Sequence, residues 1–425
     1  MRMLVLSAAV VGLGLIGSAW ISLCREAAHG RADLFTVRST VLTWMVVLLP
    51  AKPLFSNDGW SYAAIGALTN LGLSPYVWAP NILDGPLREA VDPMWRNTPS
   101  PYGPVALWWG DLAATFSQNP WVLVICHRIF ALLGVLMLAW AVPRLARWTN
   151  VNPALATALA LGSPMMLANG VAGLHNDVVM VGLMAVALVV GIEYGWAYGA
   201  VLGGLAAAIK VPGGVVCLGI VVGTTAIRAG LTARLWHGLR VGVVAVGTLL
   251  ATGIPKGLGV GWAHALTVPG EVQTPLSITT MLGRMVGQVE FMRGLGLVIA
   301  FGILIWAAVR IPTGVRACAL QAAVIGSAAL TVFSPTVHIW YLLWVMPLAA
   351  ALRLSRFQLV AYMAVGIIAG IAAPMDSSLH GLYVLIIEGT GLALIVGAVL
   401  LFTKAHRRRL SSVVEAGSPG LDRVA

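Results

Sequence analysis

The chain has 425 residues, of which 59% are hydrophobic and 10% are charged. Soluble globular chains carry about 25% charged residues, so this sequence lacks the polar surface that a protein needs to cover itself in water. The composition therefore excludes a soluble enzyme, a nucleic-acid-binding domain and a disordered chain. Because apolar segments recur from Met3 to Phe402, it also excludes a small domain on a single anchor. The chain is predicted to be a polytopic membrane protein.

The formal net charge of +11 has a membrane explanation. Lys and Arg collect in cytoplasmic loops, where they face anionic lipid headgroups, so the basic balance indicates a membrane partner and no nucleic acid. Cys24, Cys126, Cys217 and Cys318 lie in or beside apolar segments without a CxxC spacing. They are predicted to be small core residues that form neither a zinc site nor a disulfide framework.

Apolar segments of about 20 residues predict membrane spans in chain order. The expected spans are residues 3–24, 39–55, 121–143, 153–171, 176–195, 239–255, 294–312, 317–334, 339–352, 357–374 and 381–403. The stretch 197–226 is also apolar but is broken by Lys210-Val-Pro-Gly-Gly214. Such breaks are tolerated where neighbouring protein or a cavity satisfies the backbone, so two short helices are expected to meet here. The expected fold is all-α, with about 11 spans and one broken helix pair.

Basic residues give the expected orientation. They cluster around Arg25, Arg144, Arg228, Arg310, Arg353 and Lys404. The span count agrees with placing all of these clusters in the cytoplasm, provided that the broken helix pair 197–226 enters and leaves the membrane on the same side. Residues 1–403 are then one transmembrane domain, in which 56–120 and 256–291 are external catalytic loops. Residues 61–71 and 102–116 of the first loop look like amphipathic interfacial helices. Residues 404–425 are expected to form a disordered basic cytoplasmic tail.

The first external loop opens with Asn57-Asp58-Gly59, directly after an expected span. A carboxylate at the membrane–water boundary is partly desolvated, which can raise its pKa and make it a useful base. An Asp-Gly turn is the other interpretation of the same residues. Local sequence favours neither of the two.

His175-Asn176-Asp177 follows the fourth expected span. These side chains can ligate metals, but one His and one Asp do not make a metal site without further ligands. They can equally bind substrate hydroxyls, and Asp177 can cap the helix that follows. No metal site is predicted.

Two charges lie within apolar segments, where such residues are costly and usually face a cavity or a partner. Arg128 can also extend to the external interface. Lys210 stands at the helix break, where a cation can hold an anionic headgroup such as a phosphate. His338 follows an expected span and can bond a phosphate or donate a proton, although a lone interfacial histidine is more often simply hydrogen-bonded.

Several short motifs occur together in one order. They are Asn57-Asp58 with Ser61-Tyr62, Gly72-Leu-Ser-Pro-Tyr76, Trp95-Arg96 with Pro101-Tyr-Gly-Pro104, His175-Asn-Asp177, Lys210-Val-Pro212, Thr267-Val-Pro-Gly270 and His338-Ile-Trp-Tyr-Leu-Leu-Trp344. Across roughly residues 40–350 the combination resembles the polyprenol-phosphomannose-dependent α-1,6-mannosyltransferases of the GT-C class, which build the mannan backbone of lipomannan and lipoarabinomannan. Each motif is weak alone, and the combination is specific.

This resemblance implies an activity and a set of site residues. The enzyme would sit in the plasma membrane, with its active site facing outside. It would move mannose from polyprenyl-phosphate-mannose to a mannan or lipomannan acceptor, without a metal or another cofactor. Asp58 would be the general base, and Lys210, Arg128 and His338 would bind the donor phosphate. The sugar or the acceptor would contact Asn57, Tyr62, Tyr102, His175, Asn176, Asp177, Trp340 and Tyr341.

The chain also departs from this family. Members are longer, and their histidine motif usually reads His-Pro-Trp-Tyr where this chain has His338-Ile-Trp-Tyr. A related branch that forms α-1,2 linkages on phosphatidylinositol mannosides is therefore an alternative. A transporter or flippase of lipid-linked sugars is another, with Lys210 and Arg128 on its substrate path. The large external loops and the lack of an internal repeat in the sequence argue against it, and a membrane scaffold would leave the intramembrane charges unexplained.

Overall fold

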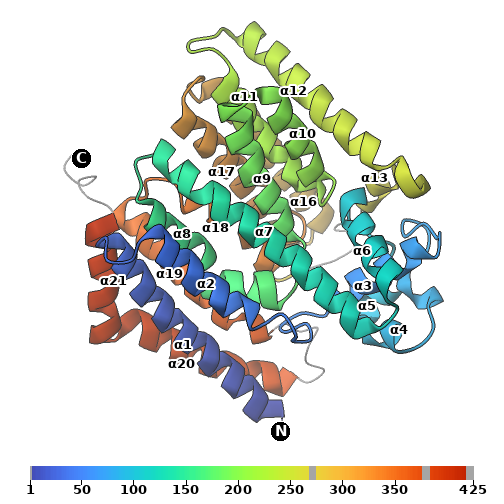
Figure 1. Cartoon of the computed structure of the whole chain (residues 1–425), viewed down its shortest axis with the longest axis horizontal. Coiled ribbons are helices and arrows are strands. Elements are labelled where there is room, and N and C mark those ends of the chain that lie inside the picture. Colours follow the sequence, from blue (N-terminus) through green and yellow to red (C-terminus); the bar gives the residue numbers. More distant parts are fainter. Residues whose placement is uncertain (1, 268–273, 376–382, 418–425) are drawn as a thin grey trace. The chain divides into compact units, whose positions relative to one another are not determined.

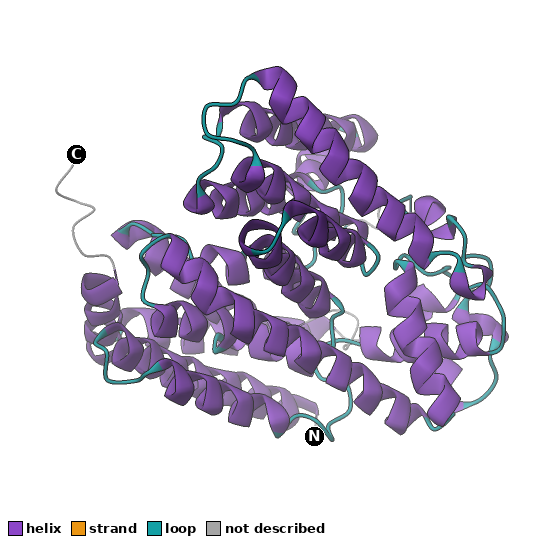
Figure 2. Cartoon of the chain, turned by 45° about the horizontal axis from the view of Figure 1, so that its top comes forward, coloured by secondary structure: helices purple, strands orange, loops and turns teal. Residues whose placement is uncertain are grey.

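The computed structural model describes residues 2–267, 274–375 and 383–417. Helices form all the regular structure of these residues, and no strand occurs among them (Figures 1 and 2). The chain divides into two compact units: residues 1–59, 142–175 and 350–425 form the first, and residues 60–141 and 176–349 form the second. Two units replace the single domain that the sequence suggested. Helices α3 (Asp58–Asn70) and α7 (Pro120–Trp148) each contribute residues to both.

The first unit is built around its N-terminal helix. Its helices are α1 (Arg2–Ala28), α2 (Leu34–Val46), α8 (Pro153–Leu161), the π-helix η2 (Met166–Ala172), α19 (Arg356–Ile371), the short η6 (Ala373–Met375), α20 (Tyr383–Phe402) and α21 (Lys404–Gly417). Helix α1 runs beside α20 and also packs on α8 (Figure 1). The fully buried Trp20 donates its indole N–H to the carbonyl of Ala158 at 2.8 Å, which fixes α1 against α8.

Residues 404–417 form a helix where a disordered tail is expected. Leu410, Val413 and Val414 are buried, and their spacing places them on one face of α21. Arg409 donates to the hydroxyl of Ser22 on α1 at 3.4 Å. The density of charge in this segment suggested a solvated chain, but the apolar stripe provides a packing surface that holds the helix. Residues 418–425 lie outside the described part of the chain.

The second unit contains the helices of both expected external loops together with the helices of several expected spans. They are η1 (Pro80–Ile82), α4 (Pro86–Ala90), α5 (Pro93–Arg96), α6 (Pro104–Phe116), α9 (Asp177–Glu193), α10 (Trp196–Ala207), η3 (Val211–Val215), α11 (Val216–Thr224), α12 (Leu231–Thr252), η4 (Pro255–Gly257), α13 (Gly261–Ala265), α15 (Ile278–Met285), α16 (Val289–Arg310), α17 (Arg316–Phe333), η5 (Ile339–Trp344) and α18 (Met346–Ala349). Helices α3 and α6 confirm the two helices expected in the first loop. They cross so closely that a Cβ on Gly66 would lie 2.5 Å from Cα of Gly110.

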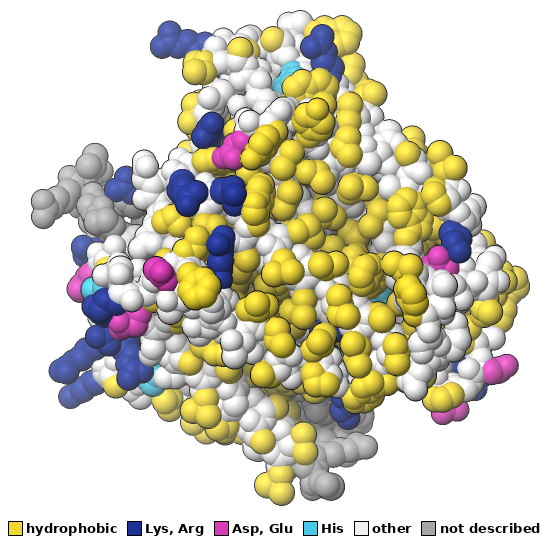
Figure 3. Space-filling view, in the orientation of Figure 1, with side chains coloured by type: hydrophobic (Ala, Val, Ile, Leu, Met, Phe, Trp, Pro, Cys, Tyr) yellow, Lys and Arg dark blue, Asp and Glu magenta, His cyan; other side chains and the backbone are white. Residues whose placement is uncertain are grey.

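The helical composition confirms a polytopic membrane protein but not the expected number of spans. Five of the described helices are long and apolar enough to cross a membrane, and counting two bent helix pairs as one span each gives seven. The expected span 39–55 is an α-helix only as far as Val46, where α2 ends, and 153–171 is bent by 62° between α8 and η2. Exposed hydrophobic side chains dominate the face in Figure 3, as lipid-facing helices require.

Candidate active site

A buried carboxylate and a buried imidazole face each other in the first unit. Oδ2 of Asp58 lies 3.5 Å from Nδ1 of His175, and the two side chains are 12% and 1% exposed. The separation allows electrostatic contact but is longer than an ordinary hydrogen bond. Asp58 is the first residue of α3, where the N-terminal end of the helix dipole favours a negative charge. Asp58 and Gly59 both lie in this helix, so the alternative of an Asp-Gly turn is wrong.

The backbone on both sides of this pair is unusual. The N–H of Leu54 donates to the carbonyl of Ala172 at 2.9 Å, which joins the segment before Asp58 to the segment before His175. Phe55 and Leu174 have φ angles of +64° and +62°, a region that residues other than glycine rarely adopt. Such strain persists only where the surrounding structure enforces it, and it is concentrated at functional sites. Two strained residues therefore flank the Asp58–His175 pair.

A second pair of opposite charges lies in the second unit. Nζ of Lys210 is 3.0 Å from Oδ1 of Asp177, the first residue of α9, and their side chains are 14% and 1% exposed. The indole N–H of Trp344 donates to the same carboxylate oxygen. Among the side chains that the structure describes, none donates to Oδ2 of Asp177. The capping role that the sequence suggested for Asp177 is wrong, because Asn176 is the N-cap of α9 and no described side chain caps this end; the Asp177 carboxylate forms an ion pair instead.

Aromatic rings surround the Lys210 ammonium, which lies 4.4 Å from the ring centroid of Tyr341, 5.2 Å from that of Trp344 and 6.0 Å from that of Tyr102. Cations at such distances are attracted by the ring faces. Tyr102 also makes an edge contact with Tyr62, with 5.0 Å between ring centroids. We call Tyr62, Tyr102, Lys210, Tyr341 and Trp344 the lysine cluster.

The helix break at Lys210 is present, as the sequence predicts, and Lys210 lies in this cluster. Helix α10 ends at Ala207 and η3 begins at Val211, which leaves Lys210 in extended backbone. The N–H of Gly103 donates to the carbonyl of Ile209 at 3.0 Å, so the loop that carries Tyr102 pairs with the broken segment. A Cβ on Gly103 would lie 2.3 Å from the carbonyl oxygen of Ala208, and only glycine allows this approach.

The first of the two loops expected to be external is further ordered by Tyr76. Its hydroxyl donates to the carbonyl of Tyr102 at 2.9 Å. Burial raises the pKa of Tyr76, because the charged phenolate is disfavoured away from water. The hydroxyl therefore stays protonated and remains a donor over the physiological range.

The His338 segment adjoins the lysine cluster. The ring of His338 stacks on that of Trp340 at 4.3 Å and meets the ring of Tyr341 edge-on at 5.5 Å. The chain before it is held by the second of the two loops expected to be external, since Thr274 accepts from the N–H of Val337 and Thr280 donates to the carbonyl of Pro335. From the Thr267–Gly270 motif, residues 268–270 lie outside the described residues.

The remaining predicted residues are buried or half-buried. Arg128 is fully buried in α7. Asn57 is half-buried immediately before Asp58, and Asn176 is buried immediately before Asp177. Within the described ranges, no three His, Cys, Asp or Glu side chains gather as a metal site requires. Metal independence itself stays a prediction.

Two ionic features were not predicted. The buried Arg293 on α16 donates through Nε to Thr280 at 3.0 Å, which connects it to the support of the His338 segment. Lys256 contacts both carboxylate oxygens of Asp111 at 3.0 and 3.1 Å, joining η4 to α6. An Arg at the start of an expected span was the available sequence signal for the first feature. The second depends on a contact between two loops, for which the sequence carries no pattern.

An all-helical chain of this composition, with buried charged pairs at helix N-termini and aromatic residues beside them, defines a multi-pass membrane enzyme. Comparison with known proteins identifies the enzyme class. The family model described as alpha-(1->6)-mannopyranosyltransferase, N-terminal domain, matches residues 1–226, and the model described as MptB C-terminal domain matches residues 266–402. The chain belongs to this mannosyltransferase family and is a hexosyltransferase.

Individual relatives support the same assignment. The chain is 30% identical to a probable alpha-(1->6)-mannopyranosyltransferase of Mycolicibacterium smegmatis, over 95% of this chain and 80% of the relative. It is 30% identical to alpha-(1->6)-mannopyranosyltransferase A of Mycobacterium tuberculosis, over 88% and 76%. It is also 30% identical to alpha-(1->6)-mannopyranosyltransferase B of Corynebacterium glutamicum, over 84% and 67%. No solved structure matches the chain.

Proposed function

We propose that the chain transfers mannose from a polyprenyl-phosphate-mannose to a mannoside acceptor, forming an α-1,6 linkage at the external face of the plasma membrane. The names of the relatives support the linkage. The apolar surface suits a donor with a long lipid tail, and no nucleotide or metal is required. The acceptor class is a mannan or lipomannan.

The observation that carries this proposal is the Asp58–His175 pair. Asp58 takes the proton of the acceptor hydroxyl as the oxygen forms its bond to the anomeric carbon. The bond from that carbon to the phosphate oxygen breaks at the same time, and polyprenyl phosphate leaves with the bonding electrons. Phosphate is a good leaving group, so one carboxylate suffices, and a β-linked donor gives an α-linked product. His175 holds the carboxylate in place from 3.5 Å.

The donor side of the proposal rests on the lysine cluster. The Lys210 ammonium can share its charge between Asp177 and a donor phosphate, because both are oxygen anions. Tyr102, Trp340 and Tyr341 provide aromatic faces on which a sugar ring can stack. His338, which contacts two of these rings, would contribute a second phosphate contact, and Arg128 a third.

The test is a transfer assay with the purified chain in vesicles. It uses polyprenyl-phosphate-[¹⁴C]mannose as donor and a synthetic α-1,6-mannobiose glycoside as acceptor, with GDP-mannose as the control donor. We expect label on the acceptor from the lipid donor alone, and linkage analysis should give a 1,6 bond. A 1,2 bond would favour the phosphatidylinositol mannoside branch. Movement of labelled donor between leaflets without transfer would favour a flippase, and either result would overturn the proposal.

A further inference from the structure

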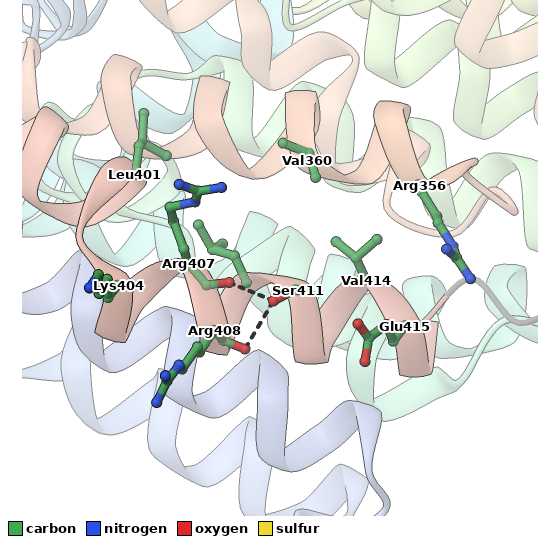
Figure 4. Close-up of a pocket in the computed structure, with 10 residues that line it drawn as sticks. Arg356, Val360, Leu401, Lys404, Arg407, Arg408, Ser411, Val414 and Glu415 are labelled. Carbon is green, nitrogen blue, oxygen red and sulfur yellow. Dashed lines mark hydrogen bonds between the residues drawn. The ribbon is translucent and has the colours of Figure 1, made fainter.

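The first unit contains a pocket of about 540 Å³ that the mannosyl transfer does not use (Figure 4). It is formed by α19, α20 and α21, and α21 begins after a bend of 58° at the end of α20. Four basic side chains line it, Arg356, Lys404, Arg407 and Arg408, together with apolar ones that include Val360 and Leu401. The pocket thus combines a cluster of positive charge with an apolar wall.

Three of the four basic side chains belong to one stripe of α21. Lys404, Arg407, Arg408 and Ser411 are spaced i, i+3, i+4 and i+7, so they project from the same side of the helix. Figure 4 shows the Arg407 side chain extending from α21 toward Leu401 on α20. The Ser411 hydroxyl donates to the backbone carbonyls of Arg407 and Arg408.

Residues other than Lys404, Arg407 and Arg408 anchor α21. Leu410, Val413 and Val414 are buried. Arg409 donates to Ser22, and the ring of His406 lies 3.1 Å from the hydroxyl of Ser18, both on α1. The helix is therefore fixed by its apolar stripe and by its contacts with α1. The stripe that begins at Lys404 lines the pocket.

The pocket lies where a lipid-facing surface ends. On α20 the side chains of Leu394, Ile395, Val399 and Phe402 are between 45% and 72% exposed, as expected for a helix in contact with acyl chains. Lys404 follows directly after this apolar helix. Basic residues immediately beyond a membrane span lie at the depth of lipid headgroups.

We propose that this pocket binds an anionic phospholipid, with the phosphate held by Lys404 and Arg407 and the acyl chains along the exposed face of α20. Four basic side chains against the single acid Glu415 favour a lipid with net negative charge over a zwitterionic one. In Figure 4, Glu415 lies at the Arg356 end of the pocket, away from Lys404. The apolar wall of Val360 and Leu401 distinguishes a lipid from a soluble phosphate, which would leave it without a contact.

The experiment uses the full chain, delipidated in a neutral detergent, with native mass spectrometry to count bound lipids. The probes are dioleoyl phosphatidylglycerol, dioleoyl phosphatidylcholine and glycerol 3-phosphate. We expect saturable binding of phosphatidylglycerol, at least tenfold weaker in the Lys404→Gln/Arg407→Gln variant. The control is Arg310→Gln/Arg316→Gln, which removes the same charge from exposed positions of the second unit and should bind as wild type.

Each other outcome overturns the proposal. Equal binding of phosphatidylcholine would remove the charge requirement, and effective competition by glycerol 3-phosphate would make the pocket a site for soluble anions. Equal losses in both double variants would mean a general effect of net charge. A Lys404→Gln/Arg407→Gln variant that is folded by its unfolding temperature and still binds as wild type would remove these two residues from the site.

Discussion

Nζ of Lys210 lies 3.0 Å from Oδ1 of Asp177, and this carboxylate also accepts the indole N–H of Trp344. The lysine at the helix break therefore neutralises a buried acid in addition to any part in donor binding. Removing one member of a buried ion pair leaves the other charge uncompensated, whereas replacing both by neutral groups is often tolerated. The two roles can be separated on this basis.

We expect Lys210→Met to lower the stability of the protein by about 3–5 kcal/mol, because Asp177 then stays buried as an uncompensated charge. The variant Lys210→Met/Asp177→Asn should regain most of that loss. If Lys210 also holds the donor phosphate, the double variant should show a donor KM raised about tenfold, with a smaller change in acceptor KM. Thermal unfolding and steady-state kinetics provide the measurements. A stable double variant with wild-type donor KM would assign Lys210 to structure alone.

Asp58→Asn should reduce mannosyl transfer by about a hundredfold to ten-thousandfold, because it removes the proton acceptor and keeps the size of the side chain. Asp84→Asn is the matched control: Asp84 also precedes a glycine within residues 56–120, and its side chain is fully exposed. It should transfer at the wild-type rate. The measurement is the initial rate at matched protein concentration. Near-normal transfer by Asp58→Asn would make Asp177 the next candidate for the base.

His175 is expected to position Asp58, and its variants should affect kcat more than either KM. Nδ2 of an asparagine can take nearly the place of the histidine Nδ1 that lies 3.5 Å from Asp58. His175→Asn should therefore retain activity within about tenfold, while His175→Leu should lose roughly a further tenfold, as for one lost polar contact. Both variants should unfold near the wild-type temperature. Equal activity of the two would show that the imidazole acts only by filling space.

Patterns local in sequence predicted much of the fold. The break at Lys210 follows from Pro212 and the two glycines after it, and the helices α3 and α6 follow from the apolar periodicity of the first loop. The helix α21 was not predicted, because its many charges suggested a solvated chain. Only Leu410, Val413 and Val414 indicate the face on which it packs. The expected span 39–55 is cut short because α2 ends at Val46, and 153–171 is bent by 62°; the length of an apolar segment reveals neither feature.

The site was predicted as separate residues and not as pairs. Asp58, His175, Asp177 and Lys210 each stand out as polar groups beside apolar segments. Which carboxylate receives which partner depends on helix packing, because the members of each pair are far apart in the chain. Arg293 stands at the start of an expected span, and its burial is not evident from that position, since an arginine there ordinarily reaches the interface.

Gly103→Ala should destabilise the loop that carries Tyr102. The added Cβ would lie 2.3 Å from the backbone oxygen of Ala208, and overpacking of this kind typically costs about 1–3 kcal/mol. The control is Gly242→Ala on α12, where no heavy atom lies within 4 Å and alanine favours the helix by up to about 1 kcal/mol. Unfolding temperatures of the two variants measure the difference. A Gly103→Ala protein as stable as Gly242→Ala would mean that the loop moves away at no cost.

The proposed external position of the first loop predicts the accessibility of single cysteines. In a chain whose four native cysteines are replaced, Asp84→Cys should react with a membrane-impermeant maleimide on intact cells, because its side chain is fully exposed. Arg316→Cys, at the exposed start of α17 in an expected cytoplasmic connection, should react only after the cells are permeabilised. Labelling is read by gel shift. If Arg316→Cys reacts on intact cells while Asp84→Cys does not, the orientation is reversed and the Asp58–His175 pair belongs to the cytoplasmic side.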